Sequence, residues 1–117
     1  MADAYLMYAE LAVRGQGSLS QAVTYVNALR TRANAGTISQ GDLNLDFILA
    51  ERSRELYWEC HRRQDLIRFG KFTGGSYLWQ WKGNSANGAP ISDHLKLFPI
   101  PDRAKAANPT LQQNTGY

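Results

Sequence analysis

Residues 51–70 read ERSRELYWECHRRQDLIRFG, and they form the most distinctive stretch of the 117-residue chain. Four carboxylates and five arginines occur there, largely at helical spacings, with Tyr57, Trp58 and Phe69 among them. A surface helix rarely carries so many aromatic side chains, and a core helix rarely carries so many charges. The stretch therefore predicts either a helix held by ion pairs against apolar walls or a surface that grips a charged ligand.

The spacing of the charges favours the structural interpretation. Arginines stand three or four positions from carboxylates, so opposite charges meet on one helix face. The interleaved acids would repel a nucleic-acid backbone, and carboxylates that cleave glycosides should flank a cleft rather than follow one helix. We therefore predict no enzymatic activity and a structural ion network that comprises Glu51, Arg52, Glu55, Glu59, Arg62, Asp65 and Arg68.

Composition narrows the remaining classes of protein. The chain has 44% hydrophobic residues and a net charge of +3, which suits one folded domain or a piece of one. Its single cysteine, Cys60, excludes an internal disulfide and a cysteine-based zinc cluster, and it is expected to be a small buried residue. His61 projects about 100° away from Cys60 on a helix, so the two predict no catalytic pair. We expect no metal site and no cofactor.

The two ends of the sequence predict different kinds of structure. Residues 3–14 and a segment that starts at Ser18 have helical patterns, and Ser18 with Gln21 has the spacing of a capping box. The glycine-rich loop between them predicts an antiparallel hairpin over residues 1–36 that is similar in length to one tetratricopeptide unit. The N-terminus carries no signal-peptide pattern and begins as though inside a helix, so we expect a fragment of a larger protein.

The central helix is predicted over residues 46–62, capped by Asn44 or Asp46, with a short helical turn over 64–69 that Gly70 closes. Residues 44–70 thus form a charged helix and turn, and residues 71–117 form a loop-rich tail with a short turn from Asp102. The expected fold class is mainly α: a tetratricopeptide-like hairpin, a further helix, and a long irregular C-terminal segment packed on the helices. The side chains expected to hold that segment in place are Tyr77, Trp79, Trp81, Leu97, Phe98 and Ile100.

The segment 77–83, YLWQWKG, contains the strongest candidates for ligand contact. In an extended conformation Tyr77, Trp79 and Trp81 would share one face. Aromatic faces of this kind stack on sugar rings and bases, and they also pack in loop cores. Trp79 and Trp81 are therefore candidate carbohydrate-binding residues, with loop packing as the alternative.

Several motifs together resemble the C-terminal part of the SusD/RagB family. They are residues 51–72 (ERSRELYWECHRRQDLIRFGKF), 77–83 (YLWQWKG), 97–101 (LFPIP) and 108–117 (NPTLQQNTGY), preceded by 5–10 (YLMYAE) and 26–33 (VNALRTRA). Motifs in this order cover nearly the whole chain. One departure is Cys60, at a position where the family often has glycine.

The resemblance implies a lipid-anchored, non-catalytic protein of the outer membrane of Bacteroidetes. Family members bind glycans or other nutrients and pass them to a TonB-dependent, SusC-like transporter. Residues 1–117 would then be the C-terminal segment of a larger SusD-like domain, with the remaining N-terminal part as its partner. Family glycan sites lie largely upstream, so no binding residue is transferred to this chain.

Two other functions stay open from the residues alone. A helical-repeat scaffold could bind a protein partner through the hairpin. A basic RNA-binding module is a more distant alternative, because the mild positive charge permits nucleic-acid contact without requiring it.

Overall fold

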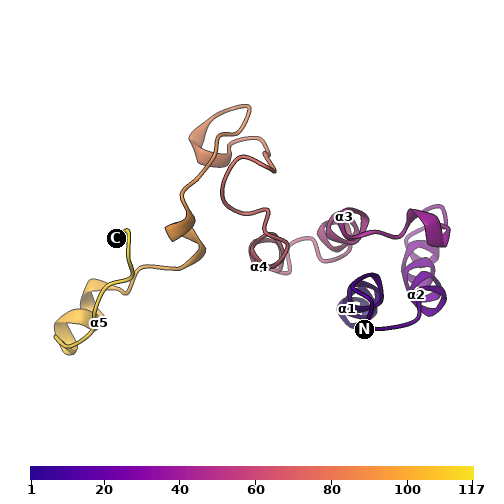
Figure 1. The fold of residues 1–117 in the computed structure, drawn as a ribbon, viewed down its shortest axis with the longest axis horizontal. Helices are drawn as coiled ribbons and strands as arrows, with labels where there is room; N and C mark the ends of the chain where they lie inside the picture. The colour runs from indigo at the N-terminus through magenta and orange to yellow at the C-terminus, as the bar shows by residue number, and fades with distance from the viewer. The chain divides into compact units, whose positions relative to one another are not determined.

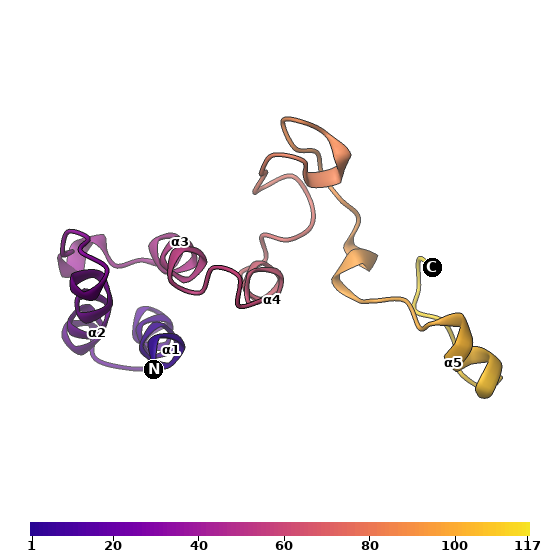
Figure 2. The same cartoon turned by 180° about the vertical axis from the view of Figure 1, so that it is seen from behind.

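The computed structural model describes residues 1–117 and is mainly helical, with five α-helices and no strand (Figures 1 and 2). An antiparallel bridge between Gly74 and Ile91 is isolated. The helices are α1 (Ala2–Val13), α2 (Leu19–Arg32), α3 (Leu45–Glu55), α4 (Arg62–Arg68) and α5 (Asp102–Ala107), and three short 3₁₀ turns are η1 (Gln40–Asp42), η2 (Lys82–Asn84) and η3 (Asp93–Lys96). None of the helices has the length and apolar character that crossing a membrane requires.

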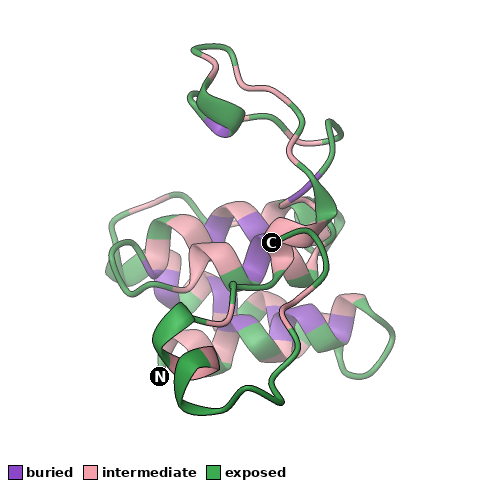
Figure 3. Cartoon of the chain, turned by 90° about the vertical axis from the view of Figure 1, so that its left-hand side faces the viewer, coloured by how far each residue is buried: buried purple, intermediate pink, exposed green.

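The chain divides into two compact units, Met1–Asp65 and Leu66–Tyr117. They differ in how they are stabilised. Ten of the eleven buried hydrophobic residues belong to the first unit, and Leu66 is the eleventh. Figure 3 shows this difference, because buried purple positions recur along the helices whereas the loops and turns are mostly pink and green.

Helices α1 and α2 pack as a hairpin, as the sequence predicts. Small alanines on both helices are buried, and this allows the two backbones to approach each other closely. Tyr5 of α1 stacks on Tyr25 of α2, with ring centroids 4.4 Å apart. The turn between the helices uses Gly15 at φ +87°, a conformation that glycine adopts without steric cost. The Ser18 hydroxyl then accepts a hydrogen bond from the Gln21 amide and caps α2.

Helix α3 begins where the sequence predicts but ends seven residues earlier than predicted. The Asn44 side chain accepts a hydrogen bond of 2.9 Å from the Phe47 amide, which makes Asn44 the cap. The helix ends at Glu55, and Trp58 and Cys60 adopt left-handed conformations at φ +68° and +62°. The prediction of one helix over residues 46–62 is therefore wrong, because Trp58 and Cys60 do not have the right-handed helical φ and ψ angles that such a helix requires. Helix α4 then occupies Arg62–Arg68, close to the predicted turn over 64–69.

The prediction that Cys60 is buried is also wrong. The residue is exposed and lies in the segment that separates α3 from α4. Its φ of +62° lies in a region that glycine populates freely and other residues adopt rarely. Cysteine is accommodated there since its side chain projects into solvent rather than into the core.

In the second unit, the extended segment that the sequence suggested over residues 77–83 is interrupted by a turn that begins at position 80 and continues into η2. The Tyr77 and Trp79 rings are neighbours at 6.2 Å, but Trp81 lies at φ +68° and ψ +3° and Gly83 at φ +61°, so Trp81 does not continue a strand-like alternation. Trp81 is 70% exposed, Leu97 57% and Phe98 70%, so these three side chains do not serve as buried anchors. The packing of residues 71–117 on the helices stays a prediction.

Polar side chains near the C-terminus hold the backbone of residues 97–100. The Gln113 carboxamide pairs with both backbone groups of Ile100, accepting from its N–H at 2.8 Å and donating to its carbonyl at 2.9 Å. Asn114 donates to the Phe98 carbonyl and Tyr117 to the Leu97 carbonyl, at 2.7 and 2.8 Å. We call Gln113, Asn114 and Tyr117 the C-terminal clamp. It satisfies the backbone of a segment whose prolines cannot take part in a normal ladder of hydrogen bonds.

Candidate functional site

The charged residues of α3 and α4 occur in two groups. Arg52, whose side chain is 3% exposed, donates from Nε to Asp65 Oδ2 at 2.8 Å, and its Nη1 lies 2.8 Å from Asp3 Oδ1. The second contact has the distance of an ion pair but not the alignment of a hydrogen bond. Arg52 therefore connects α1, α3 and α4 from inside the first unit.

Glu51 is the centre of the second group. Its Oε2 accepts from Arg30 Nη1 at 3.0 Å and also pairs with Arg54 of its own helix. Glu55 pairs with Arg32 of α2. Glu51 and Glu55 of α3 are thus both paired with arginines from α2, which links these two helices.

The other members of the predicted network lie elsewhere. Glu59 is exposed and lies outside the helix, so it does not share a helix face with Glu51 and Glu55. Arg62 donates to the Leu49 carbonyl at 2.9 Å, and the Arg68 guanidinium lies 5.3 Å from the centre of the Phe69 ring. The contributions of Asp3, Arg30 and Arg32 could not be found from spacing along one helix, since they come from other helices.

A pocket of about 440 Å³ opens beside the end of α3. Exposed Tyr57 and Trp58, whose ring centroids lie 6.2 Å apart, form part of its wall. Arg52 and Arg62 also line the pocket, but Arg52 donates a hydrogen bond to Asp65 and Arg62 donates one to the Leu49 carbonyl. Its character is therefore that of an apolar recess.

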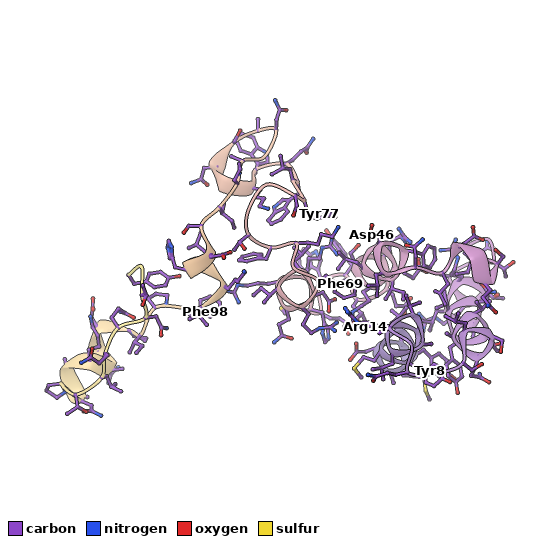
Figure 4. All side chains as sticks on the ribbon, in the orientation of Figure 1. Tyr8, Arg14, Asp46, Phe69, Tyr77 and Phe98 are labelled. Atoms are coloured by element: carbon purple, nitrogen blue, oxygen red, sulfur yellow. The ribbon has the colours of Figure 1, made fainter.

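The two candidate tryptophans have opposite environments. Trp79 is partly buried and stacks with Phe72 at a centroid distance of 6.3 Å, whereas Trp81 is 70% exposed. Lys82, which follows Trp81 in the sequence, is only 2% exposed. Its ammonium donates to the Tyr77 carbonyl at 2.6 Å and lies 4.7 Å from the centre of the Trp79 ring. We name residues 77–89 the tryptophan loop (Figure 4, where Tyr77 is labelled).

A buried lysine is the feature of this loop that sequence reasoning missed. Lysine is rarely buried, and nothing in the pattern WKG distinguishes a buried ammonium from a solvated one. The signal available was indirect: adjacent aromatic residues can supply a cation–π contact, and a tight turn exposes carbonyl oxygens.

Thr73 and Asp93 anchor the base of the tryptophan loop. The buried Thr73 hydroxyl donates to the Asp93 carboxylate, and Lys96 Nζ lies 2.9 Å from the same oxygen. The Thr73 hydrogen bond, followed by Lys96, lowers the pKa of Asp93 below its ordinary value. Because the folded-state pKa is depressed, any stabilisation from this anchor is present above the ordinary pKa and is lost as the pH falls through the lowered one.

The described residues hold no group of three His, Cys, Asp or Glu side chains that could bind a metal ion. What the chain presents instead is an exposed indole on an ordered loop, an apolar recess and arginines paired with carboxylates. Of these features, the exposed indole of Trp81 offers a surface for contact with a ligand.

Comparison with known proteins identifies the class of protein. The model of the SusD family matches residues 1–117, so the chain belongs to this family. Members of the family are binding proteins rather than enzymes.

Particular relatives are similar over the whole chain. Starch-binding protein SusD from Bacteroides thetaiotaomicron is 39% identical over 121 residues, and SusD-like protein P25 from Formosa agariphila is 35% identical over 127 residues. These alignments cover 100% of the chain but 20% and 24% of the relatives.

Solved structures agree with the sequence relatives. Surface glycan-binding protein A from Bacteroides thetaiotaomicron superposes with a TM-score of 0.78 at 34% identity, over 97% of this chain and 23% of the other. The Bacteroides uniformis protein of the same name superposes with a TM-score of 0.75 at 28% identity, over 97% and 26%. The chain thus spans about a quarter or less of the length of these relatives.

Proposed function

We propose that this chain is part of a non-catalytic glycan- or nutrient-binding protein of an outer-membrane uptake system. The observation that carries the proposal is similarity over the entire chain to a starch-binding protein at 39% identity. Relatives whose structures superpose on it are named as surface glycan-binding proteins, which supports the same ligand class.

We infer further that the protein is lipid-anchored at the cell surface and passes its ligand to a SusC-like, TonB-dependent transporter. The hairpin of α1 and α2 would join tetratricopeptide-like neighbours in the remaining part of the protein. Exposed Met7 and Leu11 on α1 support this, since residues four apart share one helix face and these two leave it apolar.

The charged residues of α3 and α4 have a structural role in this proposal. The network of Glu51, Arg52 and Asp65 would hold the helices that carry the irregular C-terminal segment, with no part in ligand binding. Its buried arginine is occupied by carboxylates of the protein itself, which supports this assignment.

A test of the proposed function uses the full-length protein in native gels that contain soluble starch, xylan, laminarin or polygalacturonate. We expect at least one polysaccharide to retard the protein relative to a gel without polysaccharide. Absence of retardation by every polysaccharide, together with salt-sensitive binding to RNA, would contradict the proposal. Co-purification with a SusC-like outer-membrane transporter tests the uptake role separately.

A further inference from the structure

Trp79 has little free ring surface for a ligand. Phe72 stacks against it with an interplanar angle of 25°, and the Tyr77 ring lies at 6.2 Å. The Lys82 ammonium is 4.7 Å from its ring centre. With two rings and a cation against it, Trp79 is the centre of a small packed cluster, and a sugar could reach it only by displacing one of them.

Lys82 holds the backbone of the tryptophan loop, which contains Trp81. Its ammonium ties the start of the tryptophan loop through the Tyr77 carbonyl, and its backbone carbonyl accepts from the Ala89 amide at 2.8 Å near the end of that loop. One residue thus joins both ends of the loop, and its burial shields these contacts from water.

Trp81 stands at the turn that Lys82 fixes. Its amide donates to the Ser85 carbonyl at 3.0 Å, and its carbonyl accepts from the Asn84 amide at 3.1 Å. Both backbone groups are therefore satisfied within the loop while the indole is 70% exposed. A bulky residue at φ +68° is a strained conformation, of a kind that is frequent at ligand-binding sites.

The chemistry beside Trp81 suits a carbohydrate. The C–H face of a pyranose ring packs on an indole, and this burial removes apolar surface of both partners from water. Asn84, which is exposed and one turn away, carries an amide with donors and an acceptor for neighbouring hydroxyl groups. Because hydrogen bonds of Lys82 and Trp81 hold the loop without a ligand, little conformational entropy should be lost when the ligand arrives.

We propose that Trp81 is a sugar-stacking residue with Asn84 as its polar partner, and that Trp79 and Lys82 position it without touching the ligand. This inference rests on the proposed glycan-binding function and deepens it. It assigns different roles to the two tryptophans that the sequence left equivalent.

The test measures affinity of the full-length protein and its variants for the polysaccharide that retards the wild type most. Trp81→Gly removes the indole while giving the backbone a residue that accepts positive φ. We expect at least about a tenfold weaker affinity, as for loss of an anchoring aromatic residue, with a melting temperature equal to or above that of the wild type. Trp81→Phe should retain most of the affinity, because it keeps an aromatic face.

Trp58→Gly is the matched control. Trp58 is also a tryptophan at φ +68° and is 87% exposed, but it lies in the first unit beside the apolar recess. We expect its removal to leave the affinity unchanged.

Three outcomes would decide against the proposal. Wild-type affinity in Trp81→Gly would show that the indole does not contact the polysaccharide. A lower melting temperature in that variant would show that the indole packs on protein. If the wild type binds no polysaccharide, both the proposed function and this inference fail. If the wild type binds and the Trp81→Gly variant binds with the same affinity, only this inference fails.

Discussion

Arg52 is the most deeply buried of the paired arginines. It has carboxylates on two sides, and both its side chain and that of Asp65 are 3% exposed. Ion pairs of this kind contribute modestly as a pair, but loss of Asp65 would leave the buried guanidinium with only the more exposed carboxylate of Asp3. The burial of the pair, rather than the number of charges in residues 51–70, determines how sensitive the first unit is to mutation.

Asp65→Asn tests this view at the residue scale. The substitution keeps the size of the side chain and removes its charge, so we expect the free energy of unfolding to fall by about 3 kcal/mol or more. Urea denaturation followed by circular dichroism measures the change. Glu55→Gln, in the other group of charged residues, is the control, because its partner Arg32 is 62% exposed, and we expect a loss below about 1 kcal/mol. Equal losses in the two variants would argue against the buried pair as a special case.

The helix boundaries show what a sequence reveals about individual elements. The caps at Ser18 and Asn44 could be predicted because they depend on residues three positions apart. The break after Glu55 could not, since Trp58 and Cys60 are not residues that favour positive φ. Likewise, the Arg54–Glu51 pair follows from helical spacing, whereas Arg30–Glu51 joins residues 21 apart and depends on helix packing.

The C-terminal clamp replaces a secondary-structure element with side-chain hydrogen bonds. Gln113 bonds both backbone groups of Ile100, as a neighbouring strand residue would. The clamp also requires glycine at position 116, where φ is +101° and an added Cβ would lie 2.6 Å from His94 Cβ. Residues 108–117 resemble a motif of the family, but their sequence does not predict which backbone groups their side chains bind by hydrogen bonds.

Gln113→Ala should open the clamp at its centre. The Ile100 amide would lose its acceptor, so its hydrogen exchange should accelerate by about fivefold, corresponding to one lost hydrogen bond of about 1 kcal/mol. Exchange of the Ile48 amide, which bonds to Asn44 in the first unit, serves as an internal control and should not change. Exchange at Ile100 equal to the wild type would mean that Asn114 and Tyr117 suffice to hold the segment.

At the scale of the whole molecule, the two units depend on different forces. The first buries alanines, leucines, isoleucine and valine between helices, whereas Leu66 is the one buried hydrophobic residue of the second. Helical periodicity reports the first kind of core, which is why the hairpin could be predicted. The second unit is organised by Lys82, Thr73 and the clamp, polar interactions that leave no periodic pattern in a sequence.

This difference predicts how the 117-residue chain responds to a protease. The second unit should be cleaved first under native conditions, because few buried apolar contacts oppose its local opening. Mass spectrometry after brief trypsin treatment should find early cuts at Lys71, Lys96, Arg103 or Lys105 and later cuts at Arg30 and Arg52. Early cleavage within α2 or α3 would contradict the assignment of the stable core to the first unit.

The burial of Lys82 has a consequence for covalent labelling. The chain has four lysines, and the other three are at least partly accessible to solvent. An amine-reactive acylating reagent must reach an unprotonated nitrogen, and the Lys82 amine is covered while it is bound to the Tyr77 carbonyl. Its acylation therefore has to wait for the tryptophan loop to open. The rate at which this one amine is acylated therefore reports how often the tryptophan loop opens.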